Sequence, residues 1–142
     1  MISKNSNTKV IFFFVKDIKT KLLRIIQTSL KHFESKEKLL IKVQDEASLK
    51  YVDELLWKEP KESFLPHVIS EKKNDDFIVL TKSQDNLNES YYLFNLCQDT
   101  IDLNASYRVI YDFDDHTNIT KKENSKKRYQ IYRKLNFDII ER

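Results

Sequence analysis

Apolar residues in this chain occur in two patterns, as short continuous runs and as longer stretches with a spacing of three or four residues. The first run, residues 9–15 (KVIFFFV), has the length and apolar character of a strand that is covered on both faces. Residues 18–34 follow with the spacing of an amphipathic helix, and Asp17 can cap its N-terminus. A second strand at residues 39–43 and a second helix at residues 45–56 repeat this order. Strand, helix, strand, helix predicts a parallel sheet with right-handed crossovers.

The second half of the chain adds three strand-like runs and one more helix. The runs are residues 77–81, 91–96 and 107–113. Thr120 and Glu123 have the spacing of a capping box, which predicts a helix over residues 121–135. Asn136 then suits the position just after the helix, where the backbone often turns left-handed. Together these elements predict an α/β fold with a mostly parallel sheet of about five strands, in one domain that covers residues 1–142.

The composition of the chain excludes several functional classes. It contains no glycine, so we expect no nucleotide-binding loop of the Walker A or G-x-G-x-x-G kind. The net charge of +3 is lower than a duplex-binding protein usually carries. No apolar run reaches the length of a membrane span, the first residues lack the apolar core of a signal peptide, and Cys97 is the only cysteine. We therefore expect a cytoplasmic protein without membrane contact.

The last predicted helix carries a cationic stripe. One side of this helix presents three cations and one aromatic ring, namely Lys122, Lys126, Tyr129 and Arg133. The opposite side, with Ile131, Tyr132 and Leu135, is predicted to pack, which leaves Tyr129 as an exposed aromatic residue. Arg and Lys can pair with acidic side chains or a C-terminal carboxylate while Tyr supplies an apolar wall, so one interpretation is a dock for an acidic peptide. The other interpretation is an ordinary solvated helix face.

The segment after the second predicted helix, residues 57–67, carries more large aromatic residues than a connecting loop needs. Its distinctive residues are Trp57, Pro60, Phe64, Pro66 and His67. The two prolines remove backbone donors and fix φ, so the segment is predicted to be a stiff irregular loop. A stiff loop that carries Trp and Phe is a candidate contact surface.

Catalysis has little support in the sequence. The three histidines, His32, His67 and His116, have no Glu or Cys at the spacing of a metal site. The carboxylates of Asp112, Asp114 and Asp115 could hold a divalent cation at the end of the last strand, but solvated turn acids are the favoured interpretation. Cys97 is expected to be a small buried hydrophobic residue. We therefore predict no catalytic residues, no metal site and no cofactor.

Two segments resemble motifs of the chi subunit of bacterial DNA polymerase III. The first is DEASLKYVDELLWKEPKESFLPHVI, which is similar to the family pattern D-E-x(n)-L-D-x-x-L-W-x-x-P-x-x-S-F-x-P-H. The second is KKRYQIYRKLNF, which is similar to the pattern R-Y-x-x-Y-R-x-x-G-F. The first match is highly specific, and the spacing between the blocks agrees over nearly the whole chain. The resemblance implies a Rossmann-like, three-layer domain that binds no nucleotide.

The resemblance also implies a non-catalytic adaptor with two partner surfaces. One surface binds the psi subunit, which links chi to the clamp loader, and it is also used by a repair helicase. The residues implied for it are Trp57, Pro60, Phe64, Pro66 and His67. The other surface binds the acidic C-terminal tail of single-stranded DNA-binding protein (SSB), which ends in a free Phe carboxylate. The residues implied for it are Lys122, Lys126, Tyr129, Gln130 and Arg133.

Two positions depart from the family pattern, and three alternatives to the adaptor are open. Gln130 stands where the family often has lysine, which removes one cation from the tail surface, and Asn136 stands where the family has glycine. The first alternative is an SSB-tail partner in DNA repair that works without psi. The others are a metal-dependent nuclease that uses the three aspartates, and direct DNA binding by the Lys-rich helix. An adaptor reaches DNA only through SSB.

Overall fold

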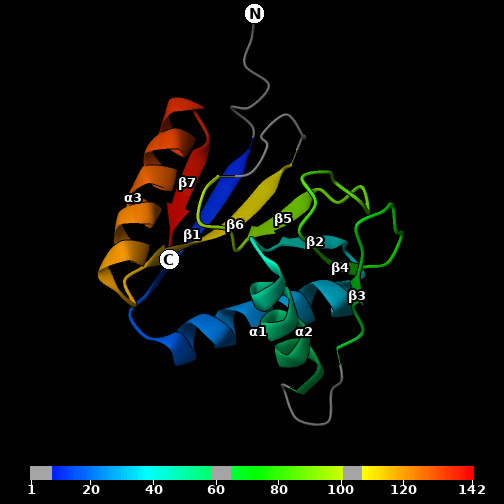
Figure 1. Ribbon diagram of the computed structural model, residues 1–142. Coiled ribbons are helices and arrows are strands. Elements are labelled where there is room, and N and C mark those ends of the chain that lie inside the picture. Colours follow the sequence, from blue (N-terminus) through cyan, green and yellow to red (C-terminus); the bar gives the residue numbers. More distant parts are fainter. Residues whose placement is uncertain (1–7, 59–64, 101–106) are drawn as a thin grey trace, which may run out of the picture.

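The computed structural model describes residues 8–58, 65–100 and 107–142, and within them the chain forms seven strands and three helices (Figure 1). In chain order these are β1 (Lys9–Val15), α1 (Ile18–Ser35), β2 (Leu39–Lys42), α2 (Glu46–Lys58), β3 (Val68–Ile69), β4 (Ile78–Thr81), β5 (Tyr92–Asn95), β6 (Val109–Asp115), α3 (Ile119–Lys134) and β7 (Asp138–Glu141). None of the helices in this part of the chain is long and apolar enough to cross a bilayer.

The strands form one sheet in the order β3-β4-β2-β5-β6-β1-β7, and every neighbouring pair is parallel. The sequence predicts about five strands, whereas the described residues form seven. The two additional strands, β3 and β7, lie at the edges of the sheet. β3 has only two residues and β7 is exposed or half-buried along its length, so neither has the continuous apolar run of a central strand.

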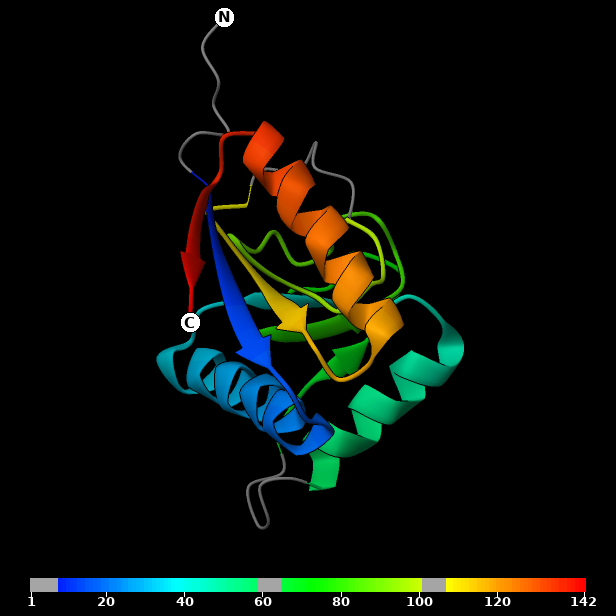
Figure 2. The ribbon, with the colours of Figure 1, turned by 90° about the vertical axis from the view of Figure 1, so that its left-hand side faces the viewer.

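Helices cover both faces of the sheet, which gives the predicted three-layer α/β arrangement. Figures 1 and 2 show α1 and α2 on one face and α3 on the other. β1 contributes to both cores because alternate side chains of a strand point to opposite faces. Phe13 and Val15 pack in the cluster that includes residues of α1 and α2, whereas Val10 and Phe12 pack in the cluster that includes Tyr132 of α3. The side chains of β1 on this face therefore pack in the same core as α3.

The helix ends follow local side-chain chemistry. Asp17 caps α1 as predicted, and its carboxylate accepts a hydrogen bond from the Thr20 N–H at 2.8 Å. The capping box predicted for the last helix is wrong, because Asn118 is the N-cap and its side chain accepts from the Lys121 N–H at 2.8 Å. Thr120 consequently lies inside the first turn of α3. Asn136 adopts a φ of 60°, the left-handed conformation predicted for it.

His32 is buried in α1 as a neutral ring. It is 2 % exposed, its Nδ1 lies 3.0 Å from the Glu37 carbonyl oxygen, and its Nε2 lies 2.8 Å from the Tyr111 hydroxyl. The carbonyl can only accept, so Nδ1 carries the proton and Nε2 accepts from the tyrosine. Burial lowers the pKa of His32 below its ordinary value.

This lowered pKa predicts a loss of stability in mild acid. The unfolded chain binds the His32 proton more tightly than the folded chain. The stability that the neutral, buried His32 contributes is therefore fully present above about pH 6.5 and is lost as the pH falls below that value. We expect His32→Gln to reduce the difference between the unfolding free energies at about pH 7.5 and about pH 5.5, measured with urea. An equal pH dependence in the variant and the wild type would contradict this assignment.

Candidate functional site

The predicted peptide dock lies along the exposed side of α3, which Figure 2 shows across one face of the sheet. Lys122, Lys126, Gln130 and Arg133 are exposed, whereas Tyr129 is half-buried. The Tyr129 ring packs on Phe12 of β1, with the ring centroids 5.7 Å apart. The sequence predicts an exposed ring at this position. The side chain is instead anchored on the sheet, and part of it is presented to solvent.

Arg133 is held next to the Tyr129 ring. Its Nη1 donates a hydrogen bond to the Tyr129 hydroxyl at 3.3 Å, and its Cζ lies 5.9 Å from the ring centroid. Within the described residues, the three cations of the stripe, Lys122, Lys126 and Arg133, form no ion pair with a carboxylate. The stripe therefore combines unpaired positive charges with the apolar face of an anchored ring.

The inner side of α3 agrees with the prediction in part. Tyr132 is buried and Leu135 packs half-buried against the core, as predicted, whereas Ile131, which was expected to pack, is 40 % exposed. The buried residues are Ser125, Arg128 and Tyr132, whose spacing of three and four places them on one side of the helix. Arg128 was missed because a charged residue in a Lys-rich run is usually solvated. The sequence signal that indicates its burial is its spacing of four residues from Tyr132, which places both side chains on one side of the helix.

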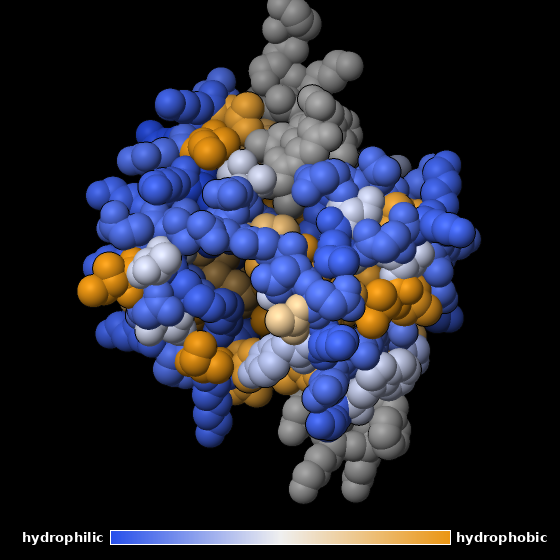
Figure 3. All heavy atoms as spheres, viewed as in Figure 1, coloured by the Kyte–Doolittle hydropathy of each residue, from blue (hydrophilic) through white to orange (hydrophobic). Residues whose placement is uncertain are grey.

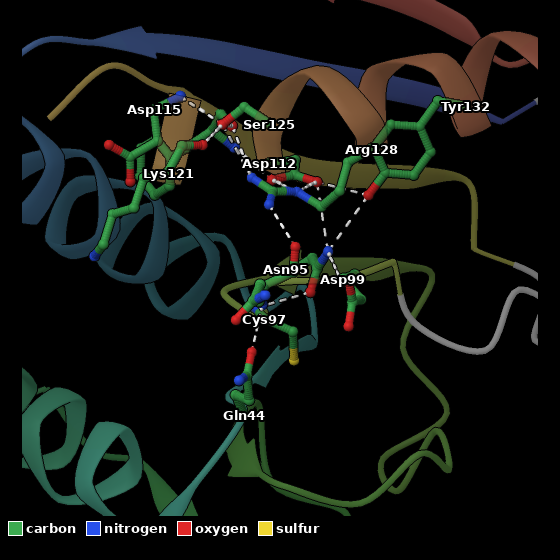
Figure 4. Close-up of polar contacts among 12 residues, drawn as sticks. Gln44, Asn95, Cys97, Asp99, Asp112, Asp115, Lys121, Ser125, Arg128 and Tyr132 are labelled. Atoms are coloured by element: carbon green, nitrogen blue, oxygen red, sulfur yellow. Dashed lines mark hydrogen bonds and ion pairs between the residues drawn. The ribbon is translucent and has the colours of Figure 1, made fainter. Parts of the chain in front are cut away.

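Arg128 and Tyr132 belong to a buried polar network around Asp112 of β6 (Figure 4). The Arg128 Nε donates to both carboxylate oxygens of Asp112 at 3.1 and 3.2 Å, and the Tyr132 hydroxyl donates at 2.6 Å. The Arg128 guanidinium also donates to the main-chain oxygens of Gln98 and Phe113. Burial raises the pKa of Asp112, and the positive charge of Arg128 opposes that rise. Asp112 is 0 % exposed, so its interpretation as a solvated turn acid is wrong.

The other two aspartates of β6 have separate partners. Asp115 is buried and lies 2.6 Å from the Lys21 ammonium of α1, so its interpretation as a solvated residue is also wrong. Asp114 is partly exposed and lies 2.8 Å from the His116 Nε2. The hydrogen bonds from Lys21 and Thr117 lower the pKa of Asp115 in spite of its burial. The part of the chain that the structure describes contains no group of three His, Cys, Asp or Glu residues placed to hold a metal ion.

A cavity of ≈ 340 Å³ lies at the carboxyl ends of β2, β5 and β6, where parallel α/β folds commonly bind ligands. Figure 3 shows this hollow within a largely hydrophilic surface. Lys21, Asp112 and Arg128 line it, and each forms one of the ion pairs described above. Cys97 also lines it, and burial raises the pKa of its thiol to about 11. A thiol with this pKa is protonated at neutral pH, so Cys97 is not an activated nucleophile.

A second candidate surface lies at the C-terminal end of α2. Trp57 was predicted to lie in a loop, but it is part of the last turn of α2 and is 42 % exposed. Pro66 is exposed and His67 is buried, and both line a cavity of ≈ 140 Å³ next to Trp57. The remaining walls come from Phe33, Val68, Asp76 and Phe77. Pro60 and Phe64, which were predicted to belong to this surface, lie outside the described residues.

The chain is thus an α/β protein with a cationic stripe on α3 and a partly exposed tryptophan at the end of α2. The family model described as DNA polymerase III chi subunit, HolC, matches residues 8–140, and the chain belongs to this family. It is accordingly an accessory subunit of DNA polymerase III and is associated with that complex. A comparison with curated proteins found no match.

Proposed function

We propose that the chain is a non-catalytic adaptor that joins the clamp loader, through the psi subunit, to the acidic C-terminal tail of SSB in the cytoplasm. The observation that carries this proposal is the stripe on α3. Three cations without carboxylate partners among the described residues share one side of α3 with a tyrosine that is packed on Phe12. An acidic peptide with an aromatic end complements both the charge and the apolar wall of this stripe.

The stripe offers different contacts along its length. Arg133 lies beside the Tyr129 hydroxyl and can form paired hydrogen bonds with a carboxylate, for which its planar guanidinium is suited. Lys126 and Lys122 lie about two and about three turns from Arg133 toward the N-terminus of α3, and can pair with further acidic side chains. Gln130 can donate amide hydrogen bonds but adds no charge. We therefore assign the terminal carboxylate or an acidic side chain to Arg133 and the preceding acidic residues to the lysines.

The surface at the end of α2 is the proposed contact for psi, or for a repair helicase where psi is absent. A partly exposed indole beside a small cavity is a common anchor in protein interfaces, because its burial removes a large apolar area from water. Trp57, Pro66 and His67 supply the described part of this surface. Pro60 and Phe64 complete the assignment from the family pattern.

A bridging experiment tests the adaptor. Single-stranded DNA on beads is coated with SSB, and capture of the chain and of psi is measured separately and together. We expect the chain to bind coated but not bare DNA, and psi to be retained only when the chain is present. Equal capture by bare DNA would favour direct DNA binding. Failure of the captured chain to retain psi would favour the repair alternative, and the helicase is then tested in place of psi. SSB with its C-terminal tail removed is the matched control.

A further inference from the structure

Three aromatic residues line the small cavity at the end of α2. They are Trp57 in the last turn of α2, Phe33 in the last turn of α1, and Phe77 just before β4. Trp57 and Phe77 are both partly exposed, so the cavity opens at the surface of the molecule. Its volume of ≈ 140 Å³ is close to that of an engineered protein cavity of about 150 Å³ that binds benzene. The cavity can therefore hold the end of one side chain.

The indole of Trp57 is held in place by residues of its own surface. Its Nε1 donates a hydrogen bond to the Asp53 Oδ1 at 3.1 Å, and the His67 Nε2 lies 2.7 Å from the same oxygen. The Trp57 and His67 rings are in contact, with centroids 4.4 Å apart and planes inclined by 39°. This wall of the cavity is therefore formed before a ligand enters, which lowers the entropic cost of binding.

The charge that faces the cavity is negative. Asp76 lines it, and the main-chain N–H and carbonyl oxygen of Asp76 are hydrogen-bonded to Asn74 and Asn88. Within the described residues, its carboxylate forms no ion pair. The described lining contains no lysine or arginine, and the pair formed by Asp53 and His67 adds no net positive charge. A cation that enters the cavity therefore meets a carboxylate without a competing cation.

We propose that the cavity is a cation site, in which the rings of Phe33, Trp57 and Phe77 and the carboxylate of Asp76 receive a lysine or arginine side chain of psi. A cation is attracted to the face of an aromatic ring, and most strongly to that of tryptophan. The Asp76 carboxylate can form a charge-assisted hydrogen bond with the same group, whereas an uncharged apolar side chain gains nothing from it. The cation site stands on the lining of the cavity, and the assignment of the cation to psi rests on the proposed function.

A titration with n-butylammonium chloride tests the cation site, because this ion reproduces the four-carbon stem and the ammonium group of lysine. Trp57 is the only tryptophan in the chain, so incorporation of a fluorinated tryptophan gives a single fluorine NMR resonance from one wall of the cavity. We expect n-butylammonium to shift this resonance to saturation. It should bind at least about fivefold more tightly than n-butanol, which has the same length and no charge. Sodium chloride at equal concentration corrects for ionic strength.

Asp76→Asn should reduce the preference for n-butylammonium over n-butanol to less than about twofold. Asp75→Asn is the matched control, since Asp75 carries the same charge but pairs with Lys38 and does not line the cavity. It should leave both affinities unchanged, and circular dichroism shows whether each variant is folded. Equal affinities for the two compounds in the wild type, binding of neither, or equal losses in the two variants would overturn the cation site.

Binding of psi then separates the cation site from the proposed function. Asp76→Asn should weaken psi binding by at least about fivefold, and Asp75→Asn by less than about twofold. Equal psi binding by the wild type and Asp76→Asn would overturn the assignment of the cation to psi. A chain that binds n-butylammonium at Trp57 but does not bind psi would support the cation site and refute the clamp-loader contact.

Discussion

Replacement of Asp112 by alanine is expected to lower the free energy of unfolding by about 3–5 kcal/mol. The variant leaves the Arg128 guanidinium buried, at 6 % exposure, without its carboxylate partner. It also removes the acceptor of the Tyr132 hydroxyl, which is 0 % exposed. An unpaired buried charge costs more than a lost surface ion pair, because the charge has no access to water. Urea unfolding of the wild type and the variant gives the difference.

Asp114→Ala is the matched control for this prediction. Asp114 lies on the same strand, but it is partly exposed and pairs with His116, so its loss should cost less than about 1 kcal/mol. A double variant, Asp112→Leu with Arg128→Met, removes both charges and should recover much of the lost stability. If Asp112→Ala is no less stable than Asp114→Ala, the buried network around Asp112 does not add the expected free energy of unfolding.

Reversal of one charge on the stripe, Arg133→Glu, is expected to weaken binding of the acidic SSB tail by about tenfold or more. A charge-assisted hydrogen bond contributes about 1.5–3 kcal/mol, and each 1.4 kcal/mol is a factor of ten in affinity. The substitution also adds a negative charge beside Tyr129, whose hydroxyl lies 3.3 Å from the Arg133 guanidinium. Calorimetric titration with a tail peptide measures the effect.

Lys134→Glu provides the control for charge. Lys134 is the next residue of α3 and is exposed, and its substitution changes the net charge by the same amount as Arg133→Glu. Position 134 points about 100° away from position 133, so its substitution should weaken binding by less than about threefold. Equal losses in the two variants would indicate general attraction between charges in place of a defined site on α3.

The central scaffold was predictable because its signals are local. The run from Lys9 to Val15 and the helical spacing after Asp17 each match one element of the structure. The edge strands β3 and β7 could not be predicted in the same way. β3 has only two residues, and β7 is polar at both ends and pairs with β1 from the opposite end of the chain. The end of α2 was placed too early because Trp57 was interpreted as a loop residue, although its indole bonds back to Asp53 within the helix.

The candidate sites were predictable as residue types but not as geometry. Helical spacing placed Lys126 and Arg133 on an exposed side of α3, which the structure also has. The packing of Tyr129 on Phe12 depends on the contact between α3 and β1, which no local pattern contains. The pairing of Arg128 with Asp112 likewise joins residues of a helix and a strand. A charged residue taken alone is expected to be solvated, so the sequence predicts exposure for both Arg128 and Asp112. Each is buried because the other neutralises its charge.

The central claim is that α3 binds the acidic tail of SSB, and a peptide titration at two salt concentrations tests it most directly. The peptide carries the tail sequence with a free C-terminal Phe carboxylate, and the same peptide with a C-terminal amide serves for comparison. Wild-type chain should bind the free-carboxylate peptide at about 0.05 M salt, several-fold more weakly at about 0.5 M salt, and the amide more weakly at both, since mobile ions screen exposed charges. Absence of binding at the lower salt concentration, or unchanged binding by Arg133→Glu, would contradict the claim.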